Sequence, residues 1–410
     1  MSFYLLILFF ISSISGITTP DNQEKNLISI KVQSNLNKPT TYIHYLSSSL
    51  LSKIEMYLDG EKVPKFDKIL PISDGNIHQV ILKFPQNFKD SCENMFSNIN
   101  SIKEIKFINF SGCTKTKQMF QYMNSLTLLD LSQFNTELVT NMELMFHGCS
   151  SLTNLDLKNF DTSKVTNMNS MFASCSSLPK IDNLNKLNTN KVTNMRFLFY
   201  ECSSLTSIDL SNFNTGNVVQ MNAMFSKCTS LTSIDVSKFD TKNVVYMGSM
   251  FFDNKLITSL DLSSFDTHNV ISTEYMFYNC KSLKKLDLSK FNTENVERMD
   301  GMFAQSGLVE LNLDNFNTSK VTSMNDMFSS ISQLTSLDLS MFDTKNLENC
   351  GQLFYYSYNL YSIDLSTFDF SKIKYKSHLL AGCNKLKYIR HPNCDFGFIG
   401  RVPNFTCITN

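Results

Sequence analysis

A phrase of about 26 residues recurs through most of this chain and limits its possible folds more than any other feature of the sequence. One clear copy begins at Leu155-Asp156-Leu157 and ends at Cys175. A repeat of this length is typical of a solenoid, in which each coil stacks on its neighbours and the product is a long surface. The first residue of the Leu-Asp-Leu core recurs every 24–27 residues, at Ile105, Leu129, Leu155, Ile181, Ile208, Ile234, Leu260, Leu286, Leu311, Leu337, Ile363 and Ile389.

Each unit contains two patterns of apolar residues. In the Leu-Asp-Leu core, two apolar residues alternate with an outward Asp, which predicts a short strand and, in the stack, a parallel β-sheet face. The apolar residues that follow are, in the copy above, Val165, Met168, Met171, Phe172 and Cys175. Their spacing is helical and predicts a short helix or 3-10 turn on the convex side. We therefore expect an α/β solenoid of about 11 to 13 coils. Repeat length and the convex helix favour a curved horseshoe, and a straighter β-helix is the alternative.

Residues 1–15 are predicted to be a secretory signal peptide. An apolar run from Phe3 to Ile11 is followed by Ser13 and Ser15, small residues placed for cleavage before Gly16. The run is too short to cross a bilayer, which takes about 20 residues, and no second run of that length follows. We expect an extracellular or cell-surface protein without a transmembrane segment after the signal peptide.

The chain on either side of the repeats departs from the pattern. Residues 16–80 contain three short strand-like runs separated by Asp-Gly turns, and they are expected to form a β-rich module that caps the first coil. A cap is needed because an open solenoid end exposes apolar side chains. The repeat array occupies residues 81–389, and residues 390–410, which gain Pro and Gly, are expected to form the opposite cap.

The balance of charge and the lack of catalytic motifs limit the classes of function expected for this chain. The 37 basic and 37 acidic residues balance, and no run of Lys and Arg follows the repeat, so a nucleic-acid surface is not expected. The six His residues share no repeat position, and no nucleophile, phosphate-loop or metal motif is present. We therefore expect neither an enzyme nor a resident cofactor.

The full repeat phrase resembles the BspA-like family of leucine-rich repeat surface proteins. The residues that carry the resemblance run from Cys202 to Thr215, with Met224-Phe225 and Cys228 completing the unit, and the likeness extends over residues 91–389. It implies a secreted or surface-displayed leucine-rich-repeat-like array, and some members of the family bind extracellular-matrix or host proteins. The chain departs from the pattern at Leu187 in place of Phe, at Thr273 and Cys350 in place of Met, and at Asn254, Ser306, Ile331 and Ser357 in place of Cys.

Cysteines fall into two groups. Six share one repeat position, and we expect buried free thiols there, because coils about 4.8 Å apart hold their side chains too far apart for a disulfide. Outside that row, Cys394 and Cys407 in the terminal cap are the favoured disulfide, and Cys92 with Cys113 is the weaker candidate. The repeat-position cysteines are Cys149, Cys175, Cys202, Cys228, Cys280 and Cys383.

The outward aspartates form a candidate binding face. Carboxylates about 4.8 Å apart repel one another, so something must offset the repulsion. The preferred explanation is hydrogen bonding to the serine that follows, such as Ser132 or Ser211, together with solvent screening. Bound Ca²⁺ and a basic protein partner are the alternatives. The aspartates are Asp130, Asp156, Asp182, Asp209, Asp235, Asp261, Asp287, Asp338 and Asp364.

Asn109, Asn317 and Asn404 begin N-glycosylation sequons, and Asn404 in the cap is the best acceptor. The combined reading is a secreted or surface protein that binds extracellular or cell-surface proteins through its strand-bearing face. The alternative is a structural coat protein that associates with copies of itself and has no specific ligand.

Overall fold

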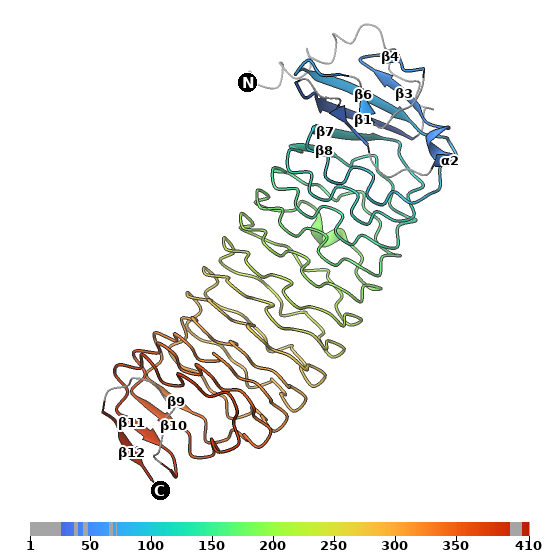
Figure 1. Cartoon of the computed structure of the whole chain (residues 1–410). Helices are drawn as coiled ribbons and strands as arrows, with labels where there is room; N and C mark the ends of the chain where they lie inside the picture. Colours follow the sequence, from blue (N-terminus) through green and yellow to red (C-terminus); the bar gives the residue numbers. More distant parts are fainter. Residues whose placement is uncertain are drawn as a thin grey trace, which may run out of the picture.

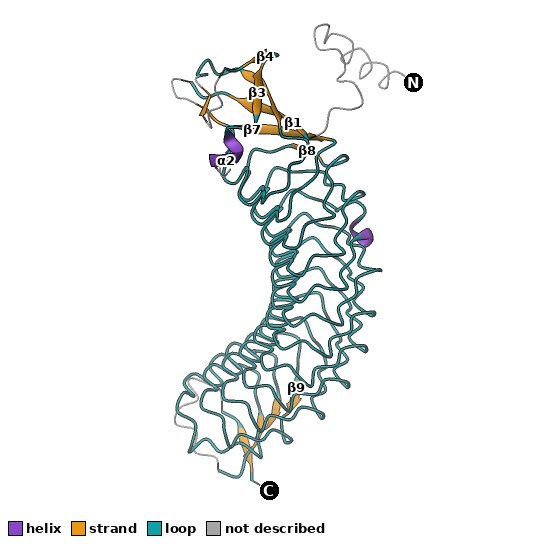
Figure 2. Ribbon diagram, turned by 90° about the vertical axis from the view of Figure 1, so that its right-hand side faces the viewer, coloured by secondary structure: helices purple, strands orange, loops and turns teal. Residues whose placement is uncertain are grey.

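The described residues form a capped, curved solenoid (Figure 1 and Figure 2). The computed structural model describes residues 26–36, 40–43, 48–64, 69–70, 72–393 and 404–409. The predicted solenoid with a parallel sheet face is confirmed. The segment expected to be a signal peptide lies outside the described residues, as does Cys394.

The N-terminal module shares one sheet with the first coils. Its strands are β1 (Leu27–Gln33), β3 (Glu55–Leu58), β4 (Glu61–Lys62) and β6 (Ile77–Lys83), and the sheet continues into β7 (Ile102–Ile108) and β8 (Leu128–Asp130) in the order β4-β3-β6-β1-β7-β8. The pairs β1–β6 and β1–β7 are antiparallel, whereas β7–β8 is parallel. The module therefore closes the solenoid by supplying the strand that its first coil would otherwise lack. Three smaller elements complete it: β2 (Thr40–Thr41), β5 (Ile69–Leu70) and α2 (Ser48–Leu51).

Within the described coils, strands occur only near the two ends of the array. A four-stranded parallel sheet, in the order β12-β11-β10-β9, ends the array. No strand forms within residues 131–335, all of which the structure describes. One 3-10 turn, η1 (Leu184–Lys186), stands on the convex side in the 27-residue unit (Figure 2). The sheet is built from β9 (Ser336–Asp338), β10 (Ser362–Asp364), β11 (Tyr388–Arg390) and β12 (Thr406–Ile408).

The helix expected over Val165–Cys175 is wrong, because these residues form successive tight turns. Ser170 and Ser174 have φ values of 54° and 56°, so the chain reverses every fourth residue. Alternate N–H groups then point along the solenoid axis and donate to the next coil, as from Met168 to the carbonyl of Asn194 at 3.0 Å. Turns of four residues and an α-helix bury nearly the same positions, so the apolar spacing could not separate them.

We call the surface built from these turns the turn face; it comprises residues 141–148 and the equivalent residues of the other coils. Phe rings stacked behind the turn face have centroids 5.6–6.0 Å apart in successive coils. The Phe rings that follow Leu-Asp-Leu are 6.0–6.5 Å apart where they pair. The coils are therefore closer together at the turn face. This face lines the concave side, and the Leu-Asp-Leu segments lie on the convex side (Figure 2).

Two rows of buried donors join the coils inside the solenoid. The Thr that follows Asn or Asp at the turn is buried in all nine coils that carry it, and Thr241, for example, donates its hydroxyl to the carbonyl of Asp266 at 2.8 Å. At the cysteine position, Cys228 donates its thiol to the carbonyl of Phe199 in the preceding coil at 3.1 Å. The thiol is a second donor to its carbonyl, because the Phe199 carbonyl also accepts the Cys202 N–H at 3.2 Å. Both rows therefore add hydrogen bonds between neighbouring coils in the buried interior.

The cysteine row contains buried free thiols, as predicted. Burial raises the pKa of Cys149 and Cys202 to about 12, so these thiols stay protonated at neutral pH. The substitutes Asn254 and Ser357 also donate to the preceding Phe carbonyl, at 2.9 and 2.7 Å. At these two positions the contact between coils therefore does not need sulfur, whereas Ile331 has no side-chain donor and Ser306 makes no such bond.

The disulfide that the structure describes is Cys92–Cys113, the weaker of the two candidates. It joins the first two coils of the turn stack across a Cα–Cα distance of 5.6 Å. Pairing of Cys394 with Cys407 stays a prediction.

Replacing Thr267 with Val should destabilise the array by about 2 kcal/mol. The Thr267 hydroxyl donates to the Asn292 carbonyl at 2.9 Å and accepts the Asn292 N–H at 2.8 Å, and valine keeps the shape while removing both bonds. Circular dichroism melting of the purified chain measures the effect. The exposed Thr258→Val is the control, and an equal loss in both variants would contradict the role of the buried row.

Candidate binding surfaces

The aspartate ladder caps the turn that follows each Leu-Asp-Leu segment. Carboxylate oxygens of eight of its nine members accept the N–H of the residue two positions on, at 2.8–3.0 Å. In Asp235, the hydroxyl and N–H of Ser237 hold the pKa of the carboxyl below its ordinary value. The ninth member, Asp182, pairs with Lys180 at 2.7 Å. The preferred sequence explanation, hydrogen bonding to the following residue, is therefore confirmed.

The ladder's other predicted roles are open. In the described parts of the chain, no group of three or more His, Cys, Asp or Glu side chains could hold a metal ion. Calcium binding and recognition of a basic partner by the ladder stay predictions. The sequon residues Asn109, Asn317 and Asn404 are all exposed, and their glycosylation is also still a prediction.

Tyrosines on the turn face pack over glycines of the next coil. Tyr122 precedes Gly148 by 26 residues, and Tyr275 precedes Gly301 by the same interval. A Cβ added at Gly148 would lie 2.5 Å from the Tyr122 ring. Glycine also accepts the positive φ of 75° that the turn needs there. Tyr356 and Gly382 form a third pair of this kind. The 26-residue Tyr–Gly spacing was the sequence signal for this surface, and sequence reasoning missed it.

A hollow of about 490 Å³ lies on the turn face between Tyr246, Tyr275 and Arg298. Arg298 is held from two sides, by Glu274 at 2.9 Å and by Asp300 at 3.0 Å, while its own side chain remains 55% exposed. Asp300 is in turn fixed by the N–H of Asn325 at 3.0 Å. The hollow therefore presents an aromatic wall and a positioned guanidinium.

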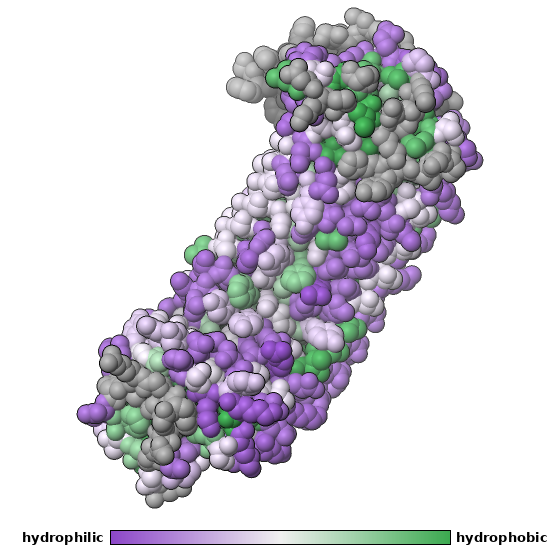
Figure 3. Space-filling view, viewed as in Figure 1, coloured by the Kyte–Doolittle hydropathy of each residue, from purple (hydrophilic) through white to green (hydrophobic). Residues whose placement is uncertain are grey.

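The concave side is otherwise polar. Figure 3 looks onto it and shows separate apolar patches within a hydrophilic surrounding. Tyr246 is 43% exposed there, and Tyr375, at the same repeat position near the end of the array, is 66% exposed. Exposed aromatic side chains spaced along a polar surface are the residues that most often anchor protein interfaces.

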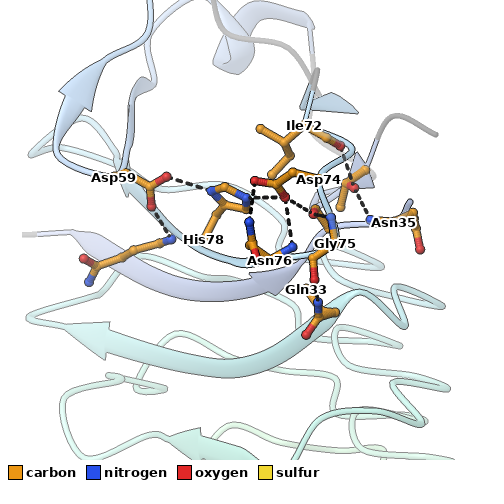
Figure 4. Close-up of polar contacts among 11 residues, drawn as sticks. Gln33, Asn35, Asp59, Ile72, Asp74, Gly75, Asn76 and His78 are labelled. Atoms are coloured by element: carbon orange, nitrogen blue, oxygen red, sulfur yellow. Dashed lines mark hydrogen bonds and ion pairs between the residues drawn. The ribbon is translucent and has the colours of Figure 1, made fainter. Parts of the chain in front are cut away.

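A second polar cluster joins two turns of the N-terminal module (Figure 4). His78 contacts Asp59 through Nδ1 at 2.7 Å and Asp74 through Nε2 at 3.0 Å. Asp74 also accepts hydrogen bonds from the Ser34 hydroxyl at 2.6 Å and the Asn76 N–H at 2.9 Å. Carboxylates on both ring nitrogens favour the imidazolium and occupy both nitrogens, which leaves no free lone pair for a general base. The geometry is that of a structural clamp.

The clamp should make the module's stability depend on pH. The Asp59 and Asp74 carboxylates raise the pKa of His78. The stabilisation that the charged His78 gives to the folded module is therefore complete below the pKa of about 6.5 that His has in the unfolded chain. It is lost as pH rises through the pKa of His78 in the folded protein. Hydrogen bonds from His78 and Ser34 lower the pKa of Asp74, so its contribution is lost only under strongly acid conditions. His78→Gln should lower the unfolding temperature in calorimetry most at about pH 5 to 6 and progressively less at alkaline pH. A difference that is constant with pH would contradict the clamp.

Comparison with known proteins places the repeats in one family of sequences. The model of the family described as "Mycoplasma protein of unknown function, DUF285" matches residues 90–207, 178–285, 204–306 and 274–390. No curated protein matches the chain.

Two solved structures are similar in part. A leucine-rich repeat protein from Bacteroides ovatus is 17% identical, with a TM-score of 0.40 over 78% of this chain and 87% of that one. The Toll–Spätzle complex of Drosophila is 14% identical, with a TM-score of 0.21 over 72% of this chain and 46% of that one.

Proposed function

We propose that this chain, which belongs over residues 90–390 to the family described as "Mycoplasma protein of unknown function, DUF285", is a secreted or cell-surface repeat protein that binds a protein partner. The observation that carries the proposal is the Tyr246–Tyr275–Arg298 hollow. Tyr and Arg are the residues most often found at binding hot spots, and here both are positioned by the scaffold before any partner arrives.

The turn face is the surface that we propose for the partner, in place of the strand-bearing face expected from sequence. On the convex side, the aspartates are engaged in capping their own turns. On the concave side, one repeat position carries side chains that vary along the array, such as Asn194, Tyr246 and Arg298. A curved row of varied side chains on a constant backbone can match the shape and chemistry of one protein surface.

Export is part of the proposal. The predicted signal peptide supports it, and so does the Cys92–Cys113 disulfide, because disulfides persist chiefly in oxidising compartments. The resemblance to BspA-like surface proteins points the same way. None of the described helices is long and apolar enough to cross a membrane.

Self-association is the second candidate function, and one observation favours it. Strand β12 stands last in its sheet, and its Ile408 is 39% exposed. An edge strand of this kind can pair with another chain. Light scattering on the purified chain tests this function, because coat assembly predicts a mass that rises with concentration in the absence of any partner.

Binding to a protein partner should depend on Tyr246. We would screen the purified chain by biolayer interferometry against immobilised extracellular-matrix and cell-surface proteins. For a partner found in this way, Tyr246→Ala should weaken binding by about 10-fold or more, as expected when a hot-spot side chain is lost. Tyr361→Ala is the matched control, because Tyr361 is 44% exposed beside the convex strand β10. An equal effect of both variants, or an effect of Asp235→Asn in place of Tyr246→Ala, would move the site to the strand-bearing face.

A further inference from the structure

A line of hollows follows the residue immediately after the cysteine position, on a different row from Tyr246. The first hollow, of about 430 Å³, is lined by the hydroxyl side chains of Ser150, Ser176, Ser203 and Thr229 and by the charged side chains of Glu201, Lys227 and Asp253. The second, of about 570 Å³, continues the same row through Lys281, Gly307, Ser332 and Tyr358. We call the second hollow the lysine–tyrosine notch.

Gly307 opens the notch. This glycine lies in the 25-residue unit, where the spacing after the cysteine position is one residue shorter than in other coils. Its N–H donates to the Cys280 carbonyl at 3.1 Å, and a Cβ at this position would overlap the Lys281 carbonyl. Only glycine fits, so a gap replaces a side chain between Lys281 and Ser332.

The notch carries uncompensated positive charge. Lys281 and Lys284 both line it and are exposed, and no acidic side chain lines it. Neighbouring lysines are neutralised, since Lys255 pairs with Asp253 at 3.4 Å and Lys285 pairs with Glu310 at 2.7 Å. Lys281 and Lys284, in contrast, form no ion pair with any other residue in the described ranges. The notch therefore favours an anionic group.

The remaining lining groups suit a sugar better than a peptide. Tyr356 and Tyr358 are 55% and 44% exposed, and aromatic rings of this kind can cover the C–H face of a sugar ring. Gln333 and Ser332 supply an amide and a hydroxyl for hydrogen bonds to sugar hydroxyls. No aliphatic side chain lines the notch to hold the apolar anchor that a peptide would bring.

We propose that the lysine–tyrosine notch binds an acidic carbohydrate. The carboxylate of a sugar unit pairs with Lys281 and Lys284, and its ring stacks on Tyr358. The hydroxyl row in the preceding coils extends the line for further sugar units, because the two carboxylates of the first hollow, Glu201 and Asp253, are paired with Lys227 at 2.7 Å and with Lys255 at 3.4 Å. This proposed carbohydrate site does not depend on the Tyr246 hollow, so a result that rejects one of the two sites does not reject the other.

Calorimetric titration of the full chain with a short oligogalacturonate and with a sialylated oligosaccharide tests the proposal. The carboxyl-reduced form of each sugar is the neutral comparator. At least one acidic sugar should bind saturably, and its reduced form should bind about 10-fold more weakly or worse, because a charged hydrogen bond is lost. Saturable binding of neither acidic sugar, or equal binding of the reduced form, would overturn the proposal.

Variants separate the notch from general surface charge. The double substitution Lys281→Gln with Lys284→Gln, and Tyr358→Ala alone, should each weaken binding of the acidic sugar by about 10-fold. Lys238→Gln with Lys290→Gln, on exposed lysines that follow the convex Ile-Asp-Val and Leu-Asp-Leu segments, should leave it unchanged. Circular dichroism checks that each variant is folded. The proposal of a carbohydrate site would be rejected if both lysine pairs weakened binding of the acidic sugar equally, or if a poly-glutamate peptide bound as tightly as the sugar. Either result would show that only the charge of the ligand determines binding.

Discussion

Backbone hydrogen bonds between successive turns hold the coils together along the whole concave side, and the other features of the molecule depend on them. They require a left-handed residue at every fourth position, such as Leu144 and Gly148, or Phe197 and Glu201. For residues other than glycine this conformation costs about 1–2 kcal/mol each, and it is worst for β-branched side chains. No Val, Ile or Thr occupies these positions in the described coils. The backbone hydrogen bonds between turns, repeated from coil to coil, together outweigh that cost.

The curvature of the solenoid follows from the same backbone hydrogen bonds. Hydrogen bonds fix the coil spacing at the turn face, whereas the Leu-Asp-Leu side is held mainly by packing and by side-chain bonds, and the coils there lie farther apart. Regular strands consequently form only near the ends, where β1 or β12 adds a partner. In the interior, buried Thr hydroxyls and Cys thiols take over part of the coupling between coils. This explains why Asn254 and Ser357 can replace Cys: each keeps a donor aimed at the preceding Phe carbonyl.

Function in such a scaffold depends on which side chains the backbone leaves free. The aspartate ladder is the most regular outward feature of the sequence, but its carboxylates are occupied in capping turns. The less regular positions are the ones available for recognition. Tyr246 and Arg298 on the turn face offer hot-spot chemistry for a protein, and Lys281 with Tyr358 offers a charged and aromatic notch. Both surfaces lie where the side chains differ from the repeat pattern, while the backbone hydrogen bonds between coils continue through the same positions.

The sequence by itself determined the solenoid, the coil length, the need for caps, the buried thiol row and the outward aspartates, because each follows from a side chain recurring at one position. It could not separate turns from a helix over Val165–Cys175, because both bury nearly the same spacing. Only the tertiary structure decided that these turns line the concave side. That outcome depends on hydrogen bonds between residues about 26 positions apart, such as Met168 and Asn194, and no local pattern encodes the coil spacing that they set. The same long-range contacts decided that Tyr122 lies over Gly148 and that Gly307 opens a notch beside Lys281.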